Sequence, residues 1–226
     1  MVDIIKPPSM LGILGGGQLG LFFVISAQKM GYKVTVLDPD KNSPAGKIAD
    51  IHLCASYNDT AALDSIKKTC VAVTTEFENI PATTLEYLEE DLIVRPSSKA
   101  VSVVQNRIHE KSFFMDNHFP VGPFIIISNI EALALVTDDI YPAILKIAQF
   151  GYDGKGQTHV NNREELGLAF DIFNREPCIL EKKLLLEAEL SVVLARDSNG
   201  KKVNFPVTEN QHISGILDIS IAPARV

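Results

Sequence analysis

The first hundred residues alternate between short apolar runs and stretches with helical spacing, and this alternation limits the folds open to the chain. The expected strands are 10–14, 33–38, 51–56, 71–77 and 92–97, and the expected helices are 20–30, 59–69 and 81–91. Strands separated by helices pair in parallel, and a parallel sheet needs helices on both faces. We therefore expect an α/β domain built on a covered parallel sheet.

The pattern changes near residue 104, where we place a domain boundary. One long helix is expected over 98–119, and another over 162–173. Between and after them come short strands, expected at 124–128, 141–148, 157–161, 178–184, 189–197 and 202–210. The last two flank "SNG", which is typical of a hairpin turn. We expect domains of residues 1–104 and 105–226, the second being α+β and antiparallel.

Composition excludes several classes of protein. The net charge of -7 argues against a nucleic-acid binder, which needs a basic surface. The three cysteines include no C-x-x-C pair, so a reduced, cytoplasmic setting is expected. The first ten residues are too polar for a signal peptide, and no apolar run approaches the roughly 18 residues of a membrane span.

The first glycine-rich loop lies between an expected strand and an expected helix. Gly15, Gly17 and Gly20 fit the spacing G-x-G-x-x-G, and Asp38 ends the next strand, where an acidic residue often meets a ribose hydroxyl. Three interpretations are open. The loop could hold a nicotinamide or flavin dinucleotide, hold another phosphate-bearing ligand, or form a tight turn without a ligand.

A second glycine-rich loop follows the strand that carries Lys146. Gly151, Gly154 and Gly156 resemble a P-loop, but Gln157 and Thr158 occupy the positions of the required Lys and Ser or Thr. A strand follows instead of a helix. The pattern favours a hairpin flap that closes over phosphates together with Lys146. A flexible hairpin without a ligand is the alternative.

Several acidic residues and one histidine add weaker signals. Glu76 and Glu78 end a parallel strand, at the sheet edge where such folds bind ligands. Glu181 and Glu189 belong to a run that by itself reads as an ordinary edge strand, and His212 alone would be a surface histidine.

Together these stretches resemble the ATP-grasp enzymes of the 5-(carboxyamino)imidazole ribonucleotide synthase family. The matching motifs, in order, are "ILGGGQLG", "LDPDKNSPAGKIAD", "VTTEFENIP", "RPS", "QNRIHEK", "ILK", "GYDGKGQ", "ELSVVLAR", "PVTENQHISGIL" and "IAPA". Each motif alone is weak, but the combination is specific. The resemblance implies a Rossmann-like pre-ATP-grasp domain with a parallel sheet, followed by an incomplete α+β ATP-grasp domain.

The resemblance also implies a reaction and its residues. ATP phosphorylates bicarbonate, and the carboxyphosphate carboxylates the amine of 5-aminoimidazole ribonucleotide, releasing ADP and phosphate. The implied catalytic residues are Lys146, Asp153 and Lys155. The implied ATP-binding residues are Arg107, Lys146, Gly151, Tyr152, Asp153, Gly154, Lys155, Gly156, Gln157, Glu181, Lys182, Lys183, Leu184, Glu189 and His212. The implied ribonucleotide-binding residues are Gly17, Gln18, Leu19, Glu76, Tyr152, Asp153 and Lys155.

The chain departs from the family in three ways. Leu21 replaces a usual Arg, Asn106 replaces a usual Asp, and family members are longer. The magnesium-binding carboxylate and an "NE" pair belong to the part without a counterpart here, so we expect no metal ligands in these residues and an incomplete active site. A homodimer acting on small molecules, without nucleic acid or membrane, is implied. The rival interpretations are a non-catalytic nucleotide-binding module and a nicotinamide-dependent oxidoreductase using Asp38.

Overall fold

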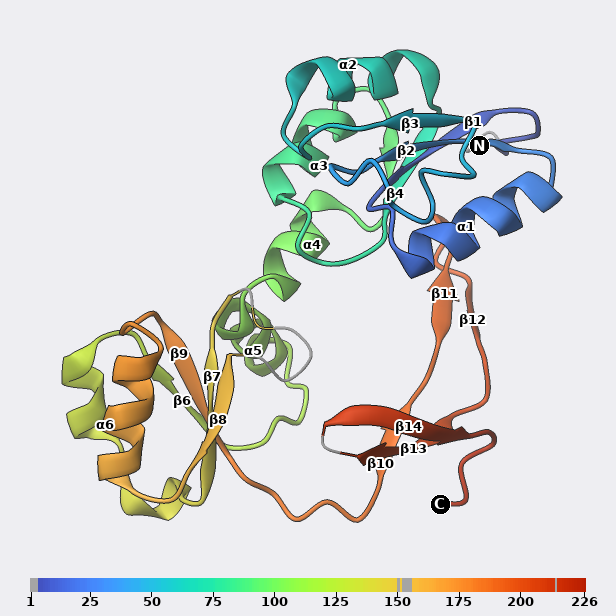
Figure 1. Cartoon of the computed structure of the whole chain (residues 1–226). Helices are drawn as coiled ribbons and strands as arrows, with labels where there is room; N and C mark the ends of the chain where they lie inside the picture. Colours follow the sequence, from blue (N-terminus) through green and yellow to red (C-terminus); the bar gives the residue numbers. More distant parts are fainter. Residues whose placement is uncertain (1–3, 150, 152–155, 214) are drawn as a thin grey trace. The chain divides into compact units, whose positions relative to one another are not determined.

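The computed structural model describes residues 4–149, 151, 156–213 and 215–226 (Figure 1). Its contacts divide the chain into two compact units, the first ending at Glu110 and the second beginning at Lys111. The boundary expected near residue 104 lies slightly earlier, at the end of helix α4 (Ser98–Val104). Among the described residues, no helix is both long and apolar enough to cross a membrane.

The first unit is built on a parallel sheet of five strands in the order β3-β2-β1-β4-β5. The strands are β1 (Met10–Leu14), β2 (Lys33–Leu37), β3 (Ile51–Leu53), β4 (Ala72–Thr75) and β5 (Ile93–Val94). The helices between them are α1 (Gln18–Lys29), α2 (Thr60–Thr69) and α3 (Ala82–Glu89), and α4 follows β5. The prediction of an α/β domain with a parallel sheet is confirmed.

Both faces of this sheet are covered, because side chains of successive strand residues point to opposite faces. On one face Ile13 packs in a buried cluster with Val24 of α1. On the other, Leu14 packs in a cluster with Ile66 of α2 and Leu85 of α3. Two complete apolar layers therefore hold the carboxyl ends of β1, β2 and β4 in fixed positions.

The second unit begins with an antiparallel sheet of four strands in the order β6-β9-β7-β8. The strands are β6 (Phe124–Ile127), β7 (Ala143–Ile147), β8 (Gln157–Val160) and β9 (Cys178–Lys182), with helix α6 (Arg163–Ile172) and two 3₁₀ turns, η1 (Ile130–Leu135) and η2 (Asp138–Ile140). The predicted antiparallel α+β arrangement is confirmed.

The two faces of this second sheet differ in chemistry. On one face Leu145 and Leu180 join a buried cluster that includes Phe170 of α6. Lys146 and Glu181 follow them in the two strands, so their side chains point to the opposite face, which we call the open face. Packing on one face therefore fixes a cation and an anion side by side on the other.

The prediction of a single helix over 98–119 is wrong. The segment forms two helices, α4 and α5 (Arg107–Asp116). The side chain of Gln105 donates to the backbone oxygen of Glu78, and the Asn106 side chain accepts hydrogen bonds from backbone N–H groups of the next helix, including that of Ile108 at 2.9 Å. Asn106 thus acts as an N-terminal cap, and a cap starts a new helix.

The strands expected over 189–197 and 202–210 are each divided in two. Their parts are β10 (Glu189–Ser191) and β11 (Leu194–Arg196), then β12 (Lys202–Asn204) and β13 (Thr208–Ile213), and β14 (Ile216–Ile221) follows. The predicted hairpin is confirmed, since β11 pairs antiparallel with β12. The second break coincides with Pro206, which lacks the N–H that a continuous ladder needs.

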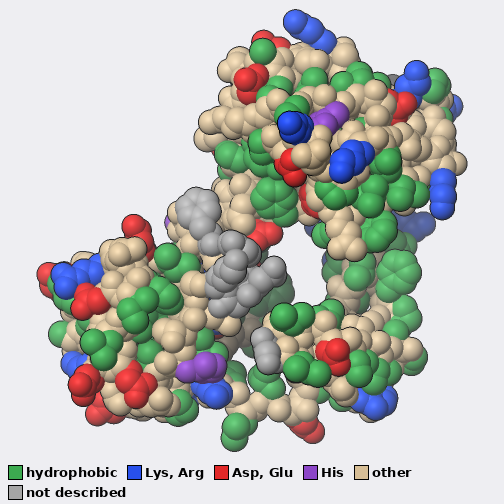
Figure 2. Space-filling model, in the orientation of Figure 1, with side chains coloured by type: hydrophobic (Ala, Val, Ile, Leu, Met, Phe, Trp, Pro, Cys, Tyr) green, Lys and Arg blue, Asp and Glu red, His purple; other side chains and the backbone are tan. Residues whose placement is uncertain are grey.

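The segment 183–226 lacks the burial seen elsewhere. None of its described residues is buried, and Ile216 of β14 and Phe205 are both 70% exposed. Figure 2 shows hydrophobic side chains at the surface over β11 and β12. This segment therefore has strand pairing without an apolar core of its own.

Candidate functional site

The first glycine loop turns the chain sharply from β1 into α1. Gly15 has a φ of 106°, a left-handed conformation that favours glycine. A Cβ atom at Gly15 would lie 2.6 Å from Cβ of Glu76, and a Cβ atom at Gly17 would lie 2.5 Å from Oε1 of Glu76. The glycines are therefore required because a glutamate side chain lies directly against the loop.

Two carboxylates occupy the backbone donors of this loop. The N–H of Gly16 donates to Oδ2 of Asp38 at 2.7 Å. The N–H groups of Gly17 and Leu19 donate to Glu76, at 2.6 and 3.0 Å. These are the donors that a dinucleotide pyrophosphate would need at the start of a helix. Their pairing within the protein argues against the dinucleotide interpretation.

Asp38 organises this loop instead of offering its carboxylate to a ribose. It is 9% exposed and also accepts hydrogen bonds from the N–H of Asp40 at 2.8 Å and the hydroxyl of Tyr57 at 3.0 Å. Burial and the hydrogen bond to Asp38 raise the pKa of Tyr57, so its hydroxyl stays protonated and donates.

The structure brings together the four residues of the first unit that were expected to bind the ribonucleotide. Gly17, Gln18 and Leu19 form the start of α1, and Glu76 follows β4 beside them. Gln18 and Leu19 are exposed, with Leu19 at 64%. The carboxylate of Glu76 faces the loop backbone, whereas Gln18 and Leu19 are among the exposed residues at this sheet edge.

In the second unit, Lys146 and Glu181 form an ion pair on the open face. Nζ of Lys146 lies 2.5 Å from Oε2 of Glu181. The side chains are 20% and 17% exposed, so water screens the pair only partly. Burial alone would raise the pKa of Glu181, but the hydrogen bonds and charges of Lys146 and Lys111 outweigh it and lower that pKa.

Lys111 is a residue of this cluster that sequence reasoning missed. It comes from α5, and its Nζ lies 3.1 Å from Oε1 of Glu181. Its Nζ also lies 5.8 Å from the centre of the Phe124 ring. The available signal was its position four residues after Arg107 in "QNRIHEK", which places both side chains on one face of a helix.

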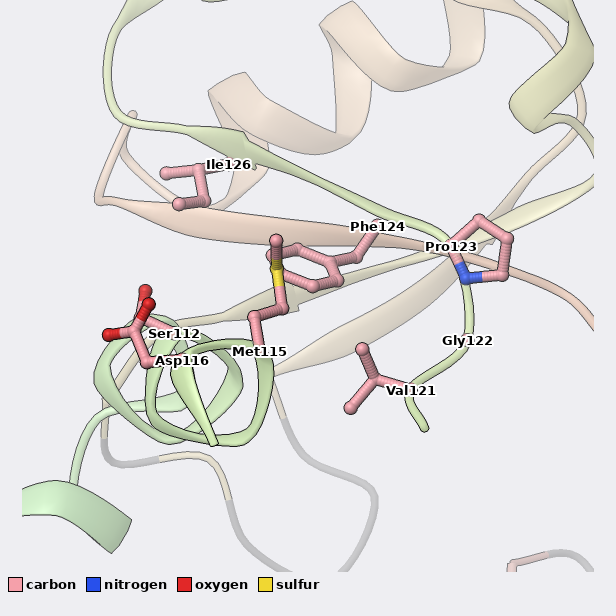
Figure 3. A pocket seen from close by; sticks show the side chains of 8 residues that line it. All are labelled: Ser112, Met115, Asp116, Val121, Gly122, Pro123, Phe124 and Ile126. Carbon is pink, nitrogen blue, oxygen red and sulfur yellow. The ribbon is translucent and has the colours of Figure 1, made fainter. Parts of the chain in front are cut away.

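A hollow of about 570 Å³ lies between α5 and β6, beside this cluster (Figure 3). Phe124 stands opposite Glu181 in the β6–β9 register, so both side chains are on the open face. Figure 3 shows Met115 of α5 directed toward Phe124. The open face thus joins an apolar hollow to a charged cluster.

The flap residues are only partly described. Gly156 has a φ of 71°, and its carbonyl accepts a hydrogen bond from Ile147 at 2.8 Å. Gln157 begins β8 directly opposite Lys146. Gly151 is described and partly buried, and Arg107 is the first residue of α5. The expected flap residues Tyr152, Asp153, Gly154 and Lys155 lie outside the described residues.

The end of β9 and the two residues after it carry the next three expected residues. The N–H of Lys182 donates to the carbonyl of Pro123, and that of Lys183 to the carbonyl of Pro142, at 2.9 and 2.8 Å. Nζ of Lys182 donates to the carbonyl of Asp139. Leu184 is 48% exposed. Two backbone donors of this expected ATP-binding run are therefore used by the unit itself.

The last two expected residues contact each other. Nδ1 of His212 on β13 forms a hydrogen bond with Oε2 of Glu189 on β10. The side chain of His212 is 35% exposed and that of Glu189 is 45% exposed. Nearby, Arg225 makes a bidentate pair with Glu209, at 2.6 and 2.9 Å. His212 and Glu189 were expected separately, and strand pairing joins them.

Within 4–149, 151, 156–213 and 215–226, no three His, Cys, Asp or Glu side chains lie close enough together to hold a metal ion between them. Two acidic residues of the expected binding sets are already engaged: Glu76 by backbone N–H groups and Glu181 by lysines.

Comparison with known proteins agrees with this architecture. The ribonucleotide synthetase preATP-grasp domain matches residues 9–105, and the ATP-grasp domain matches residues 112–226. The chain is 38% identical to N5-carboxyaminoimidazole ribonucleotide synthase of Bacillus subtilis, over 99% of this chain and 59% of the relative. The chain thus spans about 60% of the length of the curated relatives it matches.

Solved structures give the same result. An N5-carboxyaminoimidazole ribonucleotide synthetase in complex with ADP superposes with a TM-score of 0.93 at 40% identity, covering 100% of this chain and 60% of that one. The Aspergillus clavatus enzyme, in complex with ADP and 5-aminoimidazole ribonucleotide, gives 0.84 at 29% identity, covering 96% and 58%. With a preATP-grasp domain followed by an ATP-grasp domain, the chain belongs to the ATP-grasp family.

Proposed function

We propose that this chain supplies the ribonucleotide-binding and ATP-binding parts of an enzyme that carboxylates 5-aminoimidazole ribonucleotide with bicarbonate and ATP, in purine biosynthesis. One observation carries the proposal: Lys146 and Glu181 lie together on the open face of a sheet in the half of the chain that matches the ATP-grasp domain. The names of its relatives, and the ADP and ribonucleotide bound in their structures, support it.

In this reaction ATP donates a phosphoryl group to bicarbonate, and the carboxyphosphate formed transfers its carboxyl group to the amine of the ribonucleotide. Phosphoryl transfer depends mainly on positioning and on neutralising charge. Lys146 contributes the positive charge on the open face, and its 20% exposure keeps that charge poorly screened. The flap residues Tyr152, Asp153, Gly154 and Lys155 are assigned to closing over the phosphates.

The remaining roles are proposals on the same basis. Arg107 and the residues Gly151, Gly156 and Gln157 are assigned to the nucleotide phosphates. The run from Glu181 to Leu184 is assigned to adenine through its backbone groups. Glu189 is assigned to the ribose hydroxyls, and His212, which contacts Glu189, to a further contact with the nucleotide. Gln18 and Leu19 are assigned to the ribonucleotide, because they are exposed at the start of α1, at the carboxyl edge of the parallel sheet.

The experiment is a titration of the 226-residue chain with ADP, followed by an assay of bicarbonate-dependent ADP release from ATP in the presence of the ribonucleotide. The proposal predicts saturable ADP and ribonucleotide binding. Binding of ADP without ribonucleotide binding or turnover would favour a non-catalytic nucleotide-binding module. Tight binding of NADH without ADP binding would favour an oxidoreductase, and absence of ADP binding would contradict the proposal.

Assembly and setting belong to the same proposal. We assign domains of residues 1–104 and 105–226, a homodimer and a cytoplasmic setting. Cys54, Cys70 and Cys178 are all free thiols, which fits a reducing compartment. Sedimentation equilibrium measures the assembly, and a mass of one chain at all concentrations would contradict the dimer.

A further inference from the structure

Glu181 has two cationic partners, and they come from different elements. Lys146 on β7 contacts Oε2, and Lys111 on α5 contacts Oε1, so each carboxylate oxygen has its own ammonium group. The three side chains are 20% or less exposed. The cluster therefore holds one more positive charge than negative charge.

This surplus decides what happens when Lys146 leaves Glu181. A nearly buried carboxylate that loses its only partner becomes an uncompensated charge, which is strongly destabilising. Here the loss of Lys146 still leaves Lys111 on the other oxygen. Lys111 comes from α5, and its Nζ lies 5.8 Å from the centre of the Phe124 ring of β6, so it does not belong to the strand that carries Lys146.

We propose that Lys111 is a positioning residue, which holds Glu181 while Lys146 turns from that carboxylate to the phosphates of an incoming nucleoside di- or triphosphate. The inference rests on the proposed function, in which Lys146 contacts those phosphates. Glu181 keeps Lys146 in place before the nucleotide binds. Lys111 lowers the free-energy cost of separating Lys146 from Glu181, because it stays paired with that carboxylate. Without Lys111, a nucleotide that binds Lys146 would leave the carboxylate of Glu181 without a cationic partner on the open face.

The first test needs no ligand, because Lys146→Met imitates the departure of Lys146. The thermal unfolding midpoint is measured for Lys146→Met, Lys111→Met and the double variant. The double variant is expected to lose at least about 5 °C more than the sum of the two single losses, because only there is Glu181 unpaired. Adding Glu181→Gln to the double variant is expected to restore most of that excess. Additive losses would overturn the inference.

The second test uses ADP as the probe. Lys111→Met is expected to weaken ADP binding about tenfold in the unmodified chain and less than about twofold in a Glu181→Gln background. Lys111→Arg is expected to restore binding, since a guanidinium can hold the same carboxylate. Lys68→Met, at an exposed lysine of helix α2, is the matched control and is expected to leave ADP binding unchanged.

The outcomes separate the inference from the proposed function. Equal losses in both backgrounds would mean that Lys111 acts independently of Glu181, and would overturn the inference while ADP binding stands. An unmodified chain that takes up no ADP would overturn the proposed function, and the release of Lys146 with it. Additive unfolding losses in a chain that binds ADP would overturn the inference alone.

Discussion

Carboxylates lie at the centre of two sites in this molecule, but they are held differently. At the glycine loop of the first unit, Glu76 and Asp38 accept hydrogen bonds from backbone N–H groups. On the open face of the second unit, Glu181 is held by the side chains of Lys146 and Lys111. The first arrangement uses donors that belong to the fold, and the second uses donors that can rotate.

This difference in donors explains why the two glycine-rich loops are assigned different ligands. The backbone N–H groups of Gly16 and Gly17 already donate to carboxylates of the protein, so a ligand anion would have to displace Asp38 or Glu76 to reach them. A lysine side chain can exchange a carboxylate for a phosphate at little backbone cost. We infer that nucleotide phosphates are taken up where the donors are side chains.

Replacing Lys146 by Met is expected to have the largest effect. Because the variant removes a poorly screened cation from the proposed nucleotide site, ADP affinity should fall about 100-fold. Isothermal titration measures the loss, and Lys201→Met, at an exposed lysine between β11 and β12, is the matched control. An ADP affinity within about twofold of the unmodified chain would contradict the claim that the lysine of the second site binds the nucleotide phosphates.

Replacing Gly15 by Ala should damage the first unit and spare the second. The residue has a φ of 106°, and the added Cβ would lie 2.6 Å from Glu76, so we expect a loss of about 2–3 kcal/mol in the free energy of unfolding. Urea unfolding followed by hydrogen exchange assigns the loss to a unit. Gly167→Ala, where a Cβ meets nothing within 4 Å, is the control. Equal losses in the two variants would contradict the account of the loop.

Acid should weaken the second unit through Glu181. Its pKa is lowered in the folded state, so the stability that it contributes is present above its ordinary pKa and is lost as the pH falls through the folded-state value. Glu181→Gln should therefore flatten the fall in unfolding midpoint as the pH drops below the ordinary pKa of a glutamate. Glu187→Gln, at an exposed glutamate, serves as the control. An unchanged pH dependence in Glu181→Gln would contradict the cluster.

Replacing Gln18 by Ala should have the smallest effect and a selective one. The side chain is exposed at the start of α1, so its loss should leave stability and ADP binding almost unchanged. Affinity for 5-aminoimidazole ribonucleotide should fall about fivefold, the worth of one ordinary hydrogen bond. Equal loss of ribonucleotide and ADP affinity would mean that the glycine loop does not form a separate site.

The parts of this molecule that were predictable from sequence are those set by local pattern. Apolar periodicity gives the parallel sheet and its helices, and the loop "SNG" gives the hairpin of β11 and β12. The break at Asn106 escaped prediction because its helical spacing is uninterrupted, and only the capping contact of its side chain to Ile108 starts a new helix.

The contacts of the site escaped prediction for a different reason. Asp38 had the spacing of a ribose ligand, yet the fold turns its carboxylate onto Gly16. Lys111 and Glu181 are far apart in the sequence, and only the packing of α5 on the open face brings them together. Residue spacing indicates which chemistry is available, but tertiary packing decides which donors remain available to a ligand.

Hydrogen exchange of the 226-residue chain, measured with and without saturating ADP, tests the central claim most directly. The account predicts that ADP slows exchange in β7 (Ala143–Ile147) and β9 (Cys178–Lys182) and leaves the glycine loop of residues 15–20 unchanged. Slower exchange confined to residues 15–20, with β7 and β9 unaffected, would place the nucleotide at the glycine loop and contradict the account.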